Sequence, residues 1–434
     1  MMFRLLTPYL LLIALLTGSP VASRAMPPEA SNLSSPMTTM QARADFLKEK
    51  RDKTIGEALA KPLSKETEKD WQGAFWAAEL IQERTPTVRD AIADALKSWH
   101  FLDVETQRQA LETAYALYQT EFRKKILAML PEFTEPKHFA MATYYLLRTS
   151  SASTAKHKAL ALLPQKFPKW EENGILIALH HRLTADGGAE IAARPPLADL
   201  LAADFAKGKP VAFSFQRQDR RYPGLAAVKQ ADGKFARRPD GSIFAISQLA
   251  LAMSNLPGTI TNGNTPQGIF TVNGTGTTEN VFMGPTPFLV SALPMEVSVG
   301  EYFHDTAREK EKWSAAAYDA MLPESWKNYF PIHEAWNAGL AGRSEILVHG
   351  TTVDPEFTKD APFYPGTPSL GCLCAFEAWS PADGKIIASD QLGLLAAFAR
   401  TPEEKGYLVV VNLDAEERAV TLYDVLPELL KAEE

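Results

Sequence analysis

The spacing of apolar residues divides the chain into a helical part and a β-rich part. From about Phe46 to Thr184, apolar residues recur every three or four positions, which is the period of an amphipathic helix. Helix starts recur at intervals of roughly 15 to 18 residues, so one helix pair has a repeat-like length. We therefore predict an all-α solenoid or bundle over residues 46–195.

The pattern changes after residue 209. Short β-branched or aromatic runs, separated by Gly, Pro, Asn and Asp, predict strands. A mostly β domain is expected over 210–415, preceded by a linker helix at 196–209 and followed by a helical tail at 416–434. Within it, residues 304–340 are rich in Trp, Ala, Glu and Lys and predict a helical insertion. The predicted fold class is α+β. The runs are VAFSFQ, GLAAVKQ, SIFAISQLAL, GIFTV, MEVSV, EILVHG and YLVVVNL.

The N-terminus has the features of an export signal. One Arg precedes an apolar stretch from residue 5 to 16, and Ser23 and Ala25 fit the small-x-small pattern of a cleavage site. The apolar stretch is shorter than the roughly 20 residues that span a bilayer. We expect a signal peptide over 1–25, a flexible leader over 26–45, and a periplasmic protein without a stable membrane anchor after cleavage.

The overall charge narrows the class of partner. The formal net charge of −7 argues against nucleic acid, which normally requires a basic face. The helical part contains no recognisable catalytic site. It is interpreted as a scaffold that can also dock a protein partner or glycan strands.

Both cysteines, Cys372 and Cys374, lie in the hexapeptide SLGCLC. An oxidising compartment favours structural disulfides, but a bridge across one residue would close a strained ring. The pair is therefore a strained redox disulfide, a metal clip, or a site in which one sulfur is a nucleophile. For Cys374 itself, a half-buried strand position and a redox partner of Cys372 are both open.

A histidine earlier in the chain can serve as the base for a thiol nucleophile. His349 ends the apolar run EILVHG and is followed by Gly350, while Gly371 precedes Cys372. A histidine lowers the effective pKa of a thiol and moves its proton. The glycine leaves backbone N–H groups free to approach a developing oxyanion.

Three segments in order extend this pattern. NGNTPQGIFTV (262–272), ILVHG (346–350) and PSLGCLC (368–374) resemble motifs of the L,D-transpeptidase family, also called the YkuD domain. Members of that family remodel peptidoglycan in bacterial envelopes. The resemblance covers residues 210 to about 414 and does not include the helical part.

The resemblance implies a role for each motif residue. Cys372 matches the nucleophile, His349 the base, and Gly350 the residue whose carbonyl orients the imidazole. The N–H groups of Leu370, Gly371 and Cys372 match the oxyanion hole, and Ser369 matches the motif serine. Two positions differ, because Leu370 replaces the motif histidine and Cys374 stands where the family carries a substrate-holding Arg or Asn.

Substrate contacts are expected around these motifs. The candidates are Ser369, Cys374, Tyr364 on the proline-rich loop before the cysteines, and Trp336 in the insertion. The insertion returns to the chain just before EILVHG, so we predict that it forms a lid or wall over the site, with at least one aromatic residue facing the cleft.

The resemblance thus implies a cysteine transferase that acts on peptidoglycan stem peptides in cell wall biogenesis and cell shape, with no cofactor and no metal. Transfer of the acyl group to water would make it an L,D-carboxypeptidase or amidase. Two alternatives from other classes are a catalytically silent peptidoglycan-binding protein and a metal site formed by Cys372, Cys374 and His349.

Overall fold

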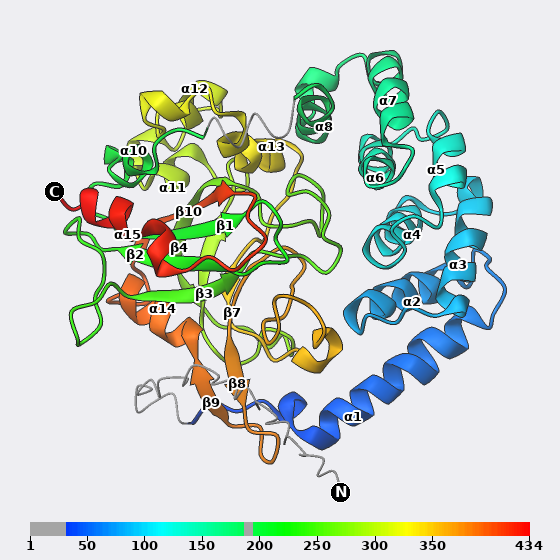
Figure 1. The fold of residues 1–434 in the computed structure, drawn as a ribbon, viewed down its shortest axis with the longest axis horizontal. Coiled ribbons are helices and arrows are strands. Elements are labelled where there is room, and N and C mark those ends of the chain that lie inside the picture. The colour runs from blue at the N-terminus through cyan, green and yellow to red at the C-terminus, as the bar shows by residue number, and fades with distance from the viewer. Residues whose placement is uncertain (1–31, 186–193) are drawn as a thin grey trace, which may run out of the picture.

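An arc of helices surrounds one side of a barrel-like sheet in the computed structural model, which describes residues 32–185 and 194–434 (Figure 1). The predicted signal peptide, residues 1–25, lies outside the described residues. The coarse prediction of a helical N-terminal part followed by a β-rich part is confirmed. Among the described residues, no helix combines the length and the apolar character needed to cross a membrane.

The helices of the arc pack around one apolar core. They are α1 (Met40–Glu49) with a π-helical continuation (Lys50–Glu57), α2 (Glu68–Leu80), α3 (Pro86–Lys97), α4 (Val104–Leu117), α5 (Arg123–Met129), α6 (Pro136–Leu147), α7 (Ala152–Lys166) and α8 (Gly174–Thr184). Side-chain caps define several helix starts: Thr85 accepts the N–H of Val88 before α3, and Asp103 that of Thr106 before α4. Fully buried side chains such as Phe75 fill the space between the helices.

Eight strands close into a barrel in the order β1-β10-β4-β5-β6-β7-β3-β2. Most neighbours are antiparallel, but the β1/β10 and β6/β7 pairs are parallel. The barrel strands are β1 (Val211–Arg217), β2 (Gly224–Lys229), β3 (Ala245–Leu249), β4 (Gly268–Gly276), β5 (Phe288–Ala292), β6 (Val348–His349), β7 (Leu373–Ala375) and β10 (Lys405–Asp414). A separate two-stranded sheet contains β8 (Glu377–Trp379) and β9 (Ile386–Ser389).

The two-residue period of the strands produces two cores. All eight barrel strands contribute to one apolar cluster, which fills the barrel and includes Ala212 and Val410. Alternate residues on the same strands, such as Phe213 and Val409, belong to a second cluster outside the barrel. Helix α14 (Asp390–Phe398), which follows β9, contributes Leu394, Leu395 and Phe398 to the inner cluster.

The helical insertion covers the outer face of the barrel. Residues 304–340 contain α12 (Ala315–Asp319), α13 (Glu334–Leu340) and short 3-10 turns, and α11 (Val299–Phe303) directly precedes them. Together with α10 (Leu197–Leu201) and α15 (Leu422–Lys431), the side chains of the insertion pack on the outward residues of β1, β4 and β10. Tyr318 and Trp326 are completely buried there. The insertion is therefore part of a hydrophobic core.

The described part of the predicted flexible leader has defined structure. The N–H of Ser35 donates to the carbonyl of Gly384 in the β8–β9 turn, and the N–H of Met40 donates to that of Pro381. Helix α1 begins at Met40. These backbone hydrogen bonds tie the first described residues to the barrel domain, a long-range pairing that local composition does not reveal.

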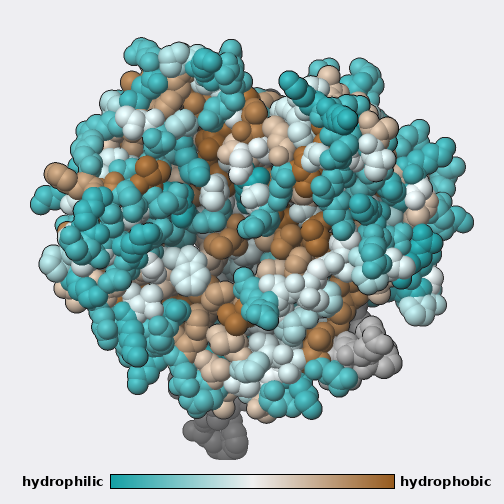
Figure 2. All heavy atoms as spheres, turned by 180° about the vertical axis from the view of Figure 1, so that it is seen from behind, coloured by the Kyte–Doolittle hydropathy of each residue, from teal (hydrophilic) through white to brown (hydrophobic). Residues whose placement is uncertain are grey.

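The arc is also attached at its other end. Helix α8 packs against α13, and Gly174 approaches the carbonyl of Asn337 so closely that no side chain would fit. Viewed from behind, hydrophilic residues cover most of the rim, while hydrophobic residues gather along the hollowed middle of this face (Figure 2). The arc thus meets the barrel domain at both ends and also in its middle, where Leu256 and Ile260 pack into the helical core.

Candidate active site

Two adjacent parallel strands bring His349 and Cys374 together. In the β6/β7 register, His349 is paired with Cys374, and Val348 with Leu373. The sulfur of Cys374 lies 3.8 Å from Nε2 and 3.9 Å from Nδ1 of the imidazole. Both side chains are about 5% exposed. The structure therefore contains a thiol–imidazole contact, but the thiol is not the one predicted from the sequence.

The orientation of the imidazole suits a base. Nδ1 is hydrogen-bonded to the carbonyl oxygen of Gly350, which can only accept, so Nδ1 carries a proton. In the neutral ring Nε2 is then free to accept a proton from Cys374. Burial alone lowers the pKa of His349, but Cys374, the Gly350 carbonyl and the nearby Glu377 outweigh it and raise this pKa above its usual value.

Sequence reasoning missed Glu377, which lies on β8 behind the imidazole. Its carboxylate accepts the N–H of Thr351 at 3.1 Å and the hydroxyl of Ser389 at 2.7 Å. Burial raises the pKa of Glu377 to about 7, against the opposing effect of these hydrogen bonds and of His349. No motif includes this residue. Its signal is a lone acidic residue within an apolar stretch, which does not reveal a partner in space.

Glycine at position 350 has a steric cause. A β-carbon on Gly350 would overlap the carboxyl group of Glu377. We expect Gly350→Ala to destabilise the protein by about 1–3 kcal/mol, because the hydrogen-bonded carboxyl group would have to move within a packed interior. Urea unfolding measures this loss.

The double variant Gly350→Ala/Glu377→Ala is the matched control for that prediction. Removing the carboxyl group removes the overlap. The loss of stability in the double variant should therefore be smaller than the sum of the losses in the two single variants. Simple additivity of the two changes would contradict the proposed overlap.

Cys372 lies in a different environment. Its sulfur accepts the N–H of Leu347 at 3.3 Å and faces the carbonyl of Glu345 at 3.4 Å. Burial raises the pKa of the Cys372 thiol, while the Leu347 N–H and the Arg343 guanidinium oppose this rise. No imidazole among the described residues is hydrogen-bonded to this sulfur. The predicted Cys372–His349 pairing is thus replaced by a Cys374–His349 contact, since the strand register aligns residue 374 with the imidazole.

The turn before Cys372 is tightly bonded. Ser369 Oγ donates to the carbonyl of Cys372 at 2.9 Å and accepts the N–H of Gly371 at 2.9 Å. The Gly371 N–H is therefore occupied, which differs from its predicted place in an oxyanion hole. Leu370 and Cys372 donate no backbone hydrogen bond to another described residue. Ser369 thus shapes the turn in this structure.

A cavity of about 810 Å³ opens beside Cys374. Phe363, Tyr364 and Thr367 from the proline-rich loop line it, together with Ser389 at the end of β9. Tyr364 is 44% exposed, and its hydroxyl group donates to Glu356 at 3.1 Å. Of the predicted substrate contacts, Tyr364 and Cys374 lie at this cavity.

Trp336 lies elsewhere. Its ring packs 6.1 Å from those of Trp313 and Tyr318, against the core outside the barrel, and it does not line the cavity beside Cys374. The predicted lid is likewise corrected, because the buried side chains of the insertion, such as Tyr318 and Trp326, pack against the outward residues of β1, β4 and β10. Its residues Tyr329 and Phe330 face a different space, between the arc and the barrel.

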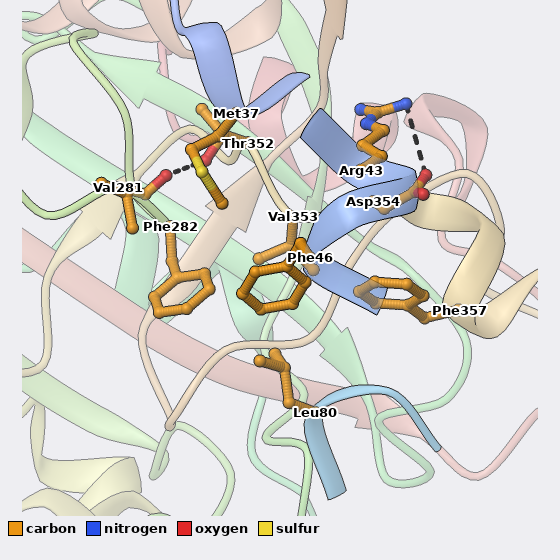
Figure 3. A pocket seen from close by; sticks show the side chains of 10 residues that line it. All are labelled: Met37, Arg43, Phe46, Leu80, Val281, Phe282, Thr352, Val353, Asp354 and Phe357. Atoms are coloured by element: carbon orange, nitrogen blue, oxygen red, sulfur yellow. Dashed lines mark hydrogen bonds and ion pairs between the residues drawn. The ribbon is translucent and has the colours of Figure 1, made fainter. Parts of the chain in front are cut away.

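Helix α1 packs against the loop that follows His349 (Figure 3). Phe46 packs with Phe282 and Phe357 at ring-centroid distances of 6.0 Å and 6.4 Å. Arg43 forms an ion pair with Asp354 at 3.3 Å. The end of the predicted leader and the loop after His349 are thus neighbours, and Asp354 on this loop is paired within the protein.

Comparison with known proteins adds no assignment. No protein-family model matches the chain, and neither a curated protein nor a solved structure matches it. Within the described ranges, no group of three or more His, Cys, Asp or Glu side chains is placed to hold a metal ion. The candidate site is therefore defined by its own geometry. It is a buried thiol–imidazole pair whose thiol, Cys374, lines a cavity.

Proposed function

We propose that this protein is a periplasmic cysteine acyltransferase or hydrolase that acts on peptidoglycan stem peptides, with a barrel domain of L,D-transpeptidase type carrying an appended helical arc. The contact between the Cys374 thiol and the His349 imidazole carries the proposal. A thiol within reach of a base, beside a cavity large enough for a peptide, is the minimal arrangement for nucleophilic acyl transfer. The motifs described above supply the substrate class.

The chemistry follows from the tautomer of His349. Nε2 takes the thiol proton, and the thiolate attacks the carbonyl carbon of the amide between diaminopimelate and the terminal D-alanine. As the C–N bond breaks, the imidazolium returns its proton to the leaving amine, and a thioester remains on the cysteine. An amine of a second stem then forms a new amide as the C–S bond breaks. Attack by water instead completes a carboxypeptidase reaction.

Cys372 is the second candidate nucleophile. It is less buried than Cys374, and the neighbouring N–H groups of Leu370 and Cys372 have no acceptor among the described residues. Such donors can stabilise an oxyanion. This arrangement requires His349 to move towards Cys372, whereas the Cys374 arrangement uses the contact already present.

Intact mass spectrometry tests the proposal. The full chain is incubated with a defined tetrapeptide muropeptide and, separately, with a carbapenem β-lactam, and a single covalent adduct is expected. Peptide fragmentation should place that adduct on Cys374. The absence of an adduct with both reagents, from protein whose thiols remain reduced, would overturn the acyl-transfer proposal.

A further inference from the structure

A groove runs along part of the boundary between the arc and the barrel domain. It comprises two cavities of about 830 Å³ and 460 Å³ that share lining residues, among them Tyr115, Arg148 and Asn255. The smaller cavity also shares Phe363 with the cavity beside Cys374. The interdomain groove, defined here as these two cavities, therefore adjoins the candidate active site.

The arc wall of the groove is cationic. Arg182 on α8 forms no ion pair or hydrogen bond within the described part of the chain. Arg148, which follows α6, donates to the carbonyl of Tyr115 at 3.1 Å and lies 4.0 Å above the Tyr115 ring. Neither guanidinium has a carboxylate partner there, so both retain the capacity to bind a carboxylate ligand.

The barrel wall carries charges of both signs. Arg221 is bound to Asp219, with a closest distance of 2.6 Å, and buried Arg220 donates to the carbonyls of Arg217 and Thr265. Glu334 accepts the N–H of Gln267. Glu417 lines the same wall and has no ion-pair partner among the described residues. A ligand that matches both walls has carboxylates facing the arc and a positive group facing the barrel.

Two buried polar atoms add a second, independent observation. Thr259 Oγ1 and Asn412 Oδ1 belong to residues that line the groove, yet neither atom has a hydrogen-bond partner among the residues that the structure describes. An unsatisfied buried polar group is unfavourable, so a side-chain rotation that turns either atom towards a ligand in the groove would be favoured by the new hydrogen bond. Peptide N–H groups and carbonyls are suitable partners.

We propose that the interdomain groove binds a short peptide that carries free carboxylates and a free amine. Arg148 and Arg182 receive the carboxylates, and Glu417 receives the ammonium group. If the proposed acyl transfer is correct, this site holds the second stem, whose amine accepts the acyl group. The inference rests on that function for its substrate class, but binding to the groove does not require the thiol.

Calorimetric titration tests the site without the chemistry. In a full chain with both cysteines replaced by serine, a disaccharide tetrapeptide with free diaminopimelate should bind. The variant Arg182→Gln should weaken this binding about tenfold, the size expected for one charge-assisted hydrogen bond. Amidation of the ligand carboxylates should weaken binding to the parent protein. The same amidation should have a much smaller effect on binding to the Arg182→Gln variant, which has already lost one partner of the carboxylates.

Arg89→Gln is the matched control, because Arg89 is an exposed arginine on α3 that pairs with its neighbour Asp90. It should leave the affinity unchanged. Equal affinity of the parent and the Arg182→Gln protein would overturn the groove assignment, as would equally tight binding of the disaccharide alone. Loss of carbapenem labelling in the cysteine-containing chain, with this binding retained, would overturn only the catalytic proposal.

Discussion

Replacing His349 by alanine is expected to slow acyl-enzyme formation by about 10²–10⁴-fold, the usual contribution of a positioned general base. Nε2 is the only imidazole nitrogen within 4 Å of the Cys374 sulfur that is free to take its proton, because Nδ1 is bound to the Gly350 carbonyl. Raising the pH should restore little of the rate, since the same imidazole also protonates the leaving amine. Stopped-flow measurement with a chromogenic β-lactam gives the rate.

His333→Ala is the control for that experiment. His333 Nε2 is bound to Asp319 at 2.8 Å in the insertion, and the residue lines none of the cavities beside either thiol. Its replacement should leave the labelling rate near that of the parent protein. Near-normal turnover in His349→Ala, with a loss in His333→Ala, would transfer the base role to His333.

The pH profile reports on the same imidazole. Because the pKa of His349 is raised, the neutral base is lost at a higher pH than for an ordinary histidine as pH falls, so the acid limb should be displaced to higher pH. The Glu377 carboxylate favours the imidazolium, so Glu377→Gln should move this limb to lower pH. If the acid limb of Glu377→Gln lies at the same pH as that of the parent protein, Glu377 does not influence the pKa of His349.

The second large effect concerns the choice between the two thiols. Cys374→Ser should reduce adduct formation by at least about 10³-fold, since a serine hydroxyl without further activation is a much poorer nucleophile. Cys372→Ser should retain most of the adduct, because the Cys372 sulfur is hydrogen-bonded to backbone groups of Leu347 and Glu345 and, among the described residues, to no imidazole. Intact mass after a fixed incubation compares the two variants.

The two serine variants form a matched pair, since each keeps one thiol in the same six-residue segment. Circular dichroism and urea unfolding should be nearly identical for both. The reverse outcome, with Cys372→Ser inactive and Cys374→Ser active, would mean that His349 reorients towards Cys372 when substrate binds. It would also return the nucleophile to the position matched by the family motif.

Local patterns determined much of the fold. The alternation in VAFSFQ and YLVVVNL appears as β1 and β10, with one face inside the barrel and the other under the insertion. Helical periodicity located the helices of the arc, and their caps lie within a few residues of the starts that it predicts. These features depend on interactions between residues close in sequence, so they can be predicted from sequence alone.

The insertion and the leader were harder to interpret. Composition correctly indicated helix in residues 304–340, but not that Tyr318 and Trp326 would be buried against the barrel. Residues 32–45 resembled a linker in composition, yet they pair with the β8–β9 turn and place Phe46 against the loop after His349. Their partners lie hundreds of residues away, and a polar, proline-containing segment has no local signature of such pairing.

The features of the candidate site also fall into those that the sequence predicts and those that depend on the tertiary structure. The sequence alone predicts a thiol–histidine centre from His349, Gly350 and the two cysteines, because their residue types and order suit that chemistry. Only the tertiary structure decided that His349 contacts Cys374, since this depends on the β6/β7 register, which is determined by packing between strands far apart in the chain. The position of Glu377 beside His349, and the interdomain groove, likewise become visible only once β8 and the arc have been placed in space.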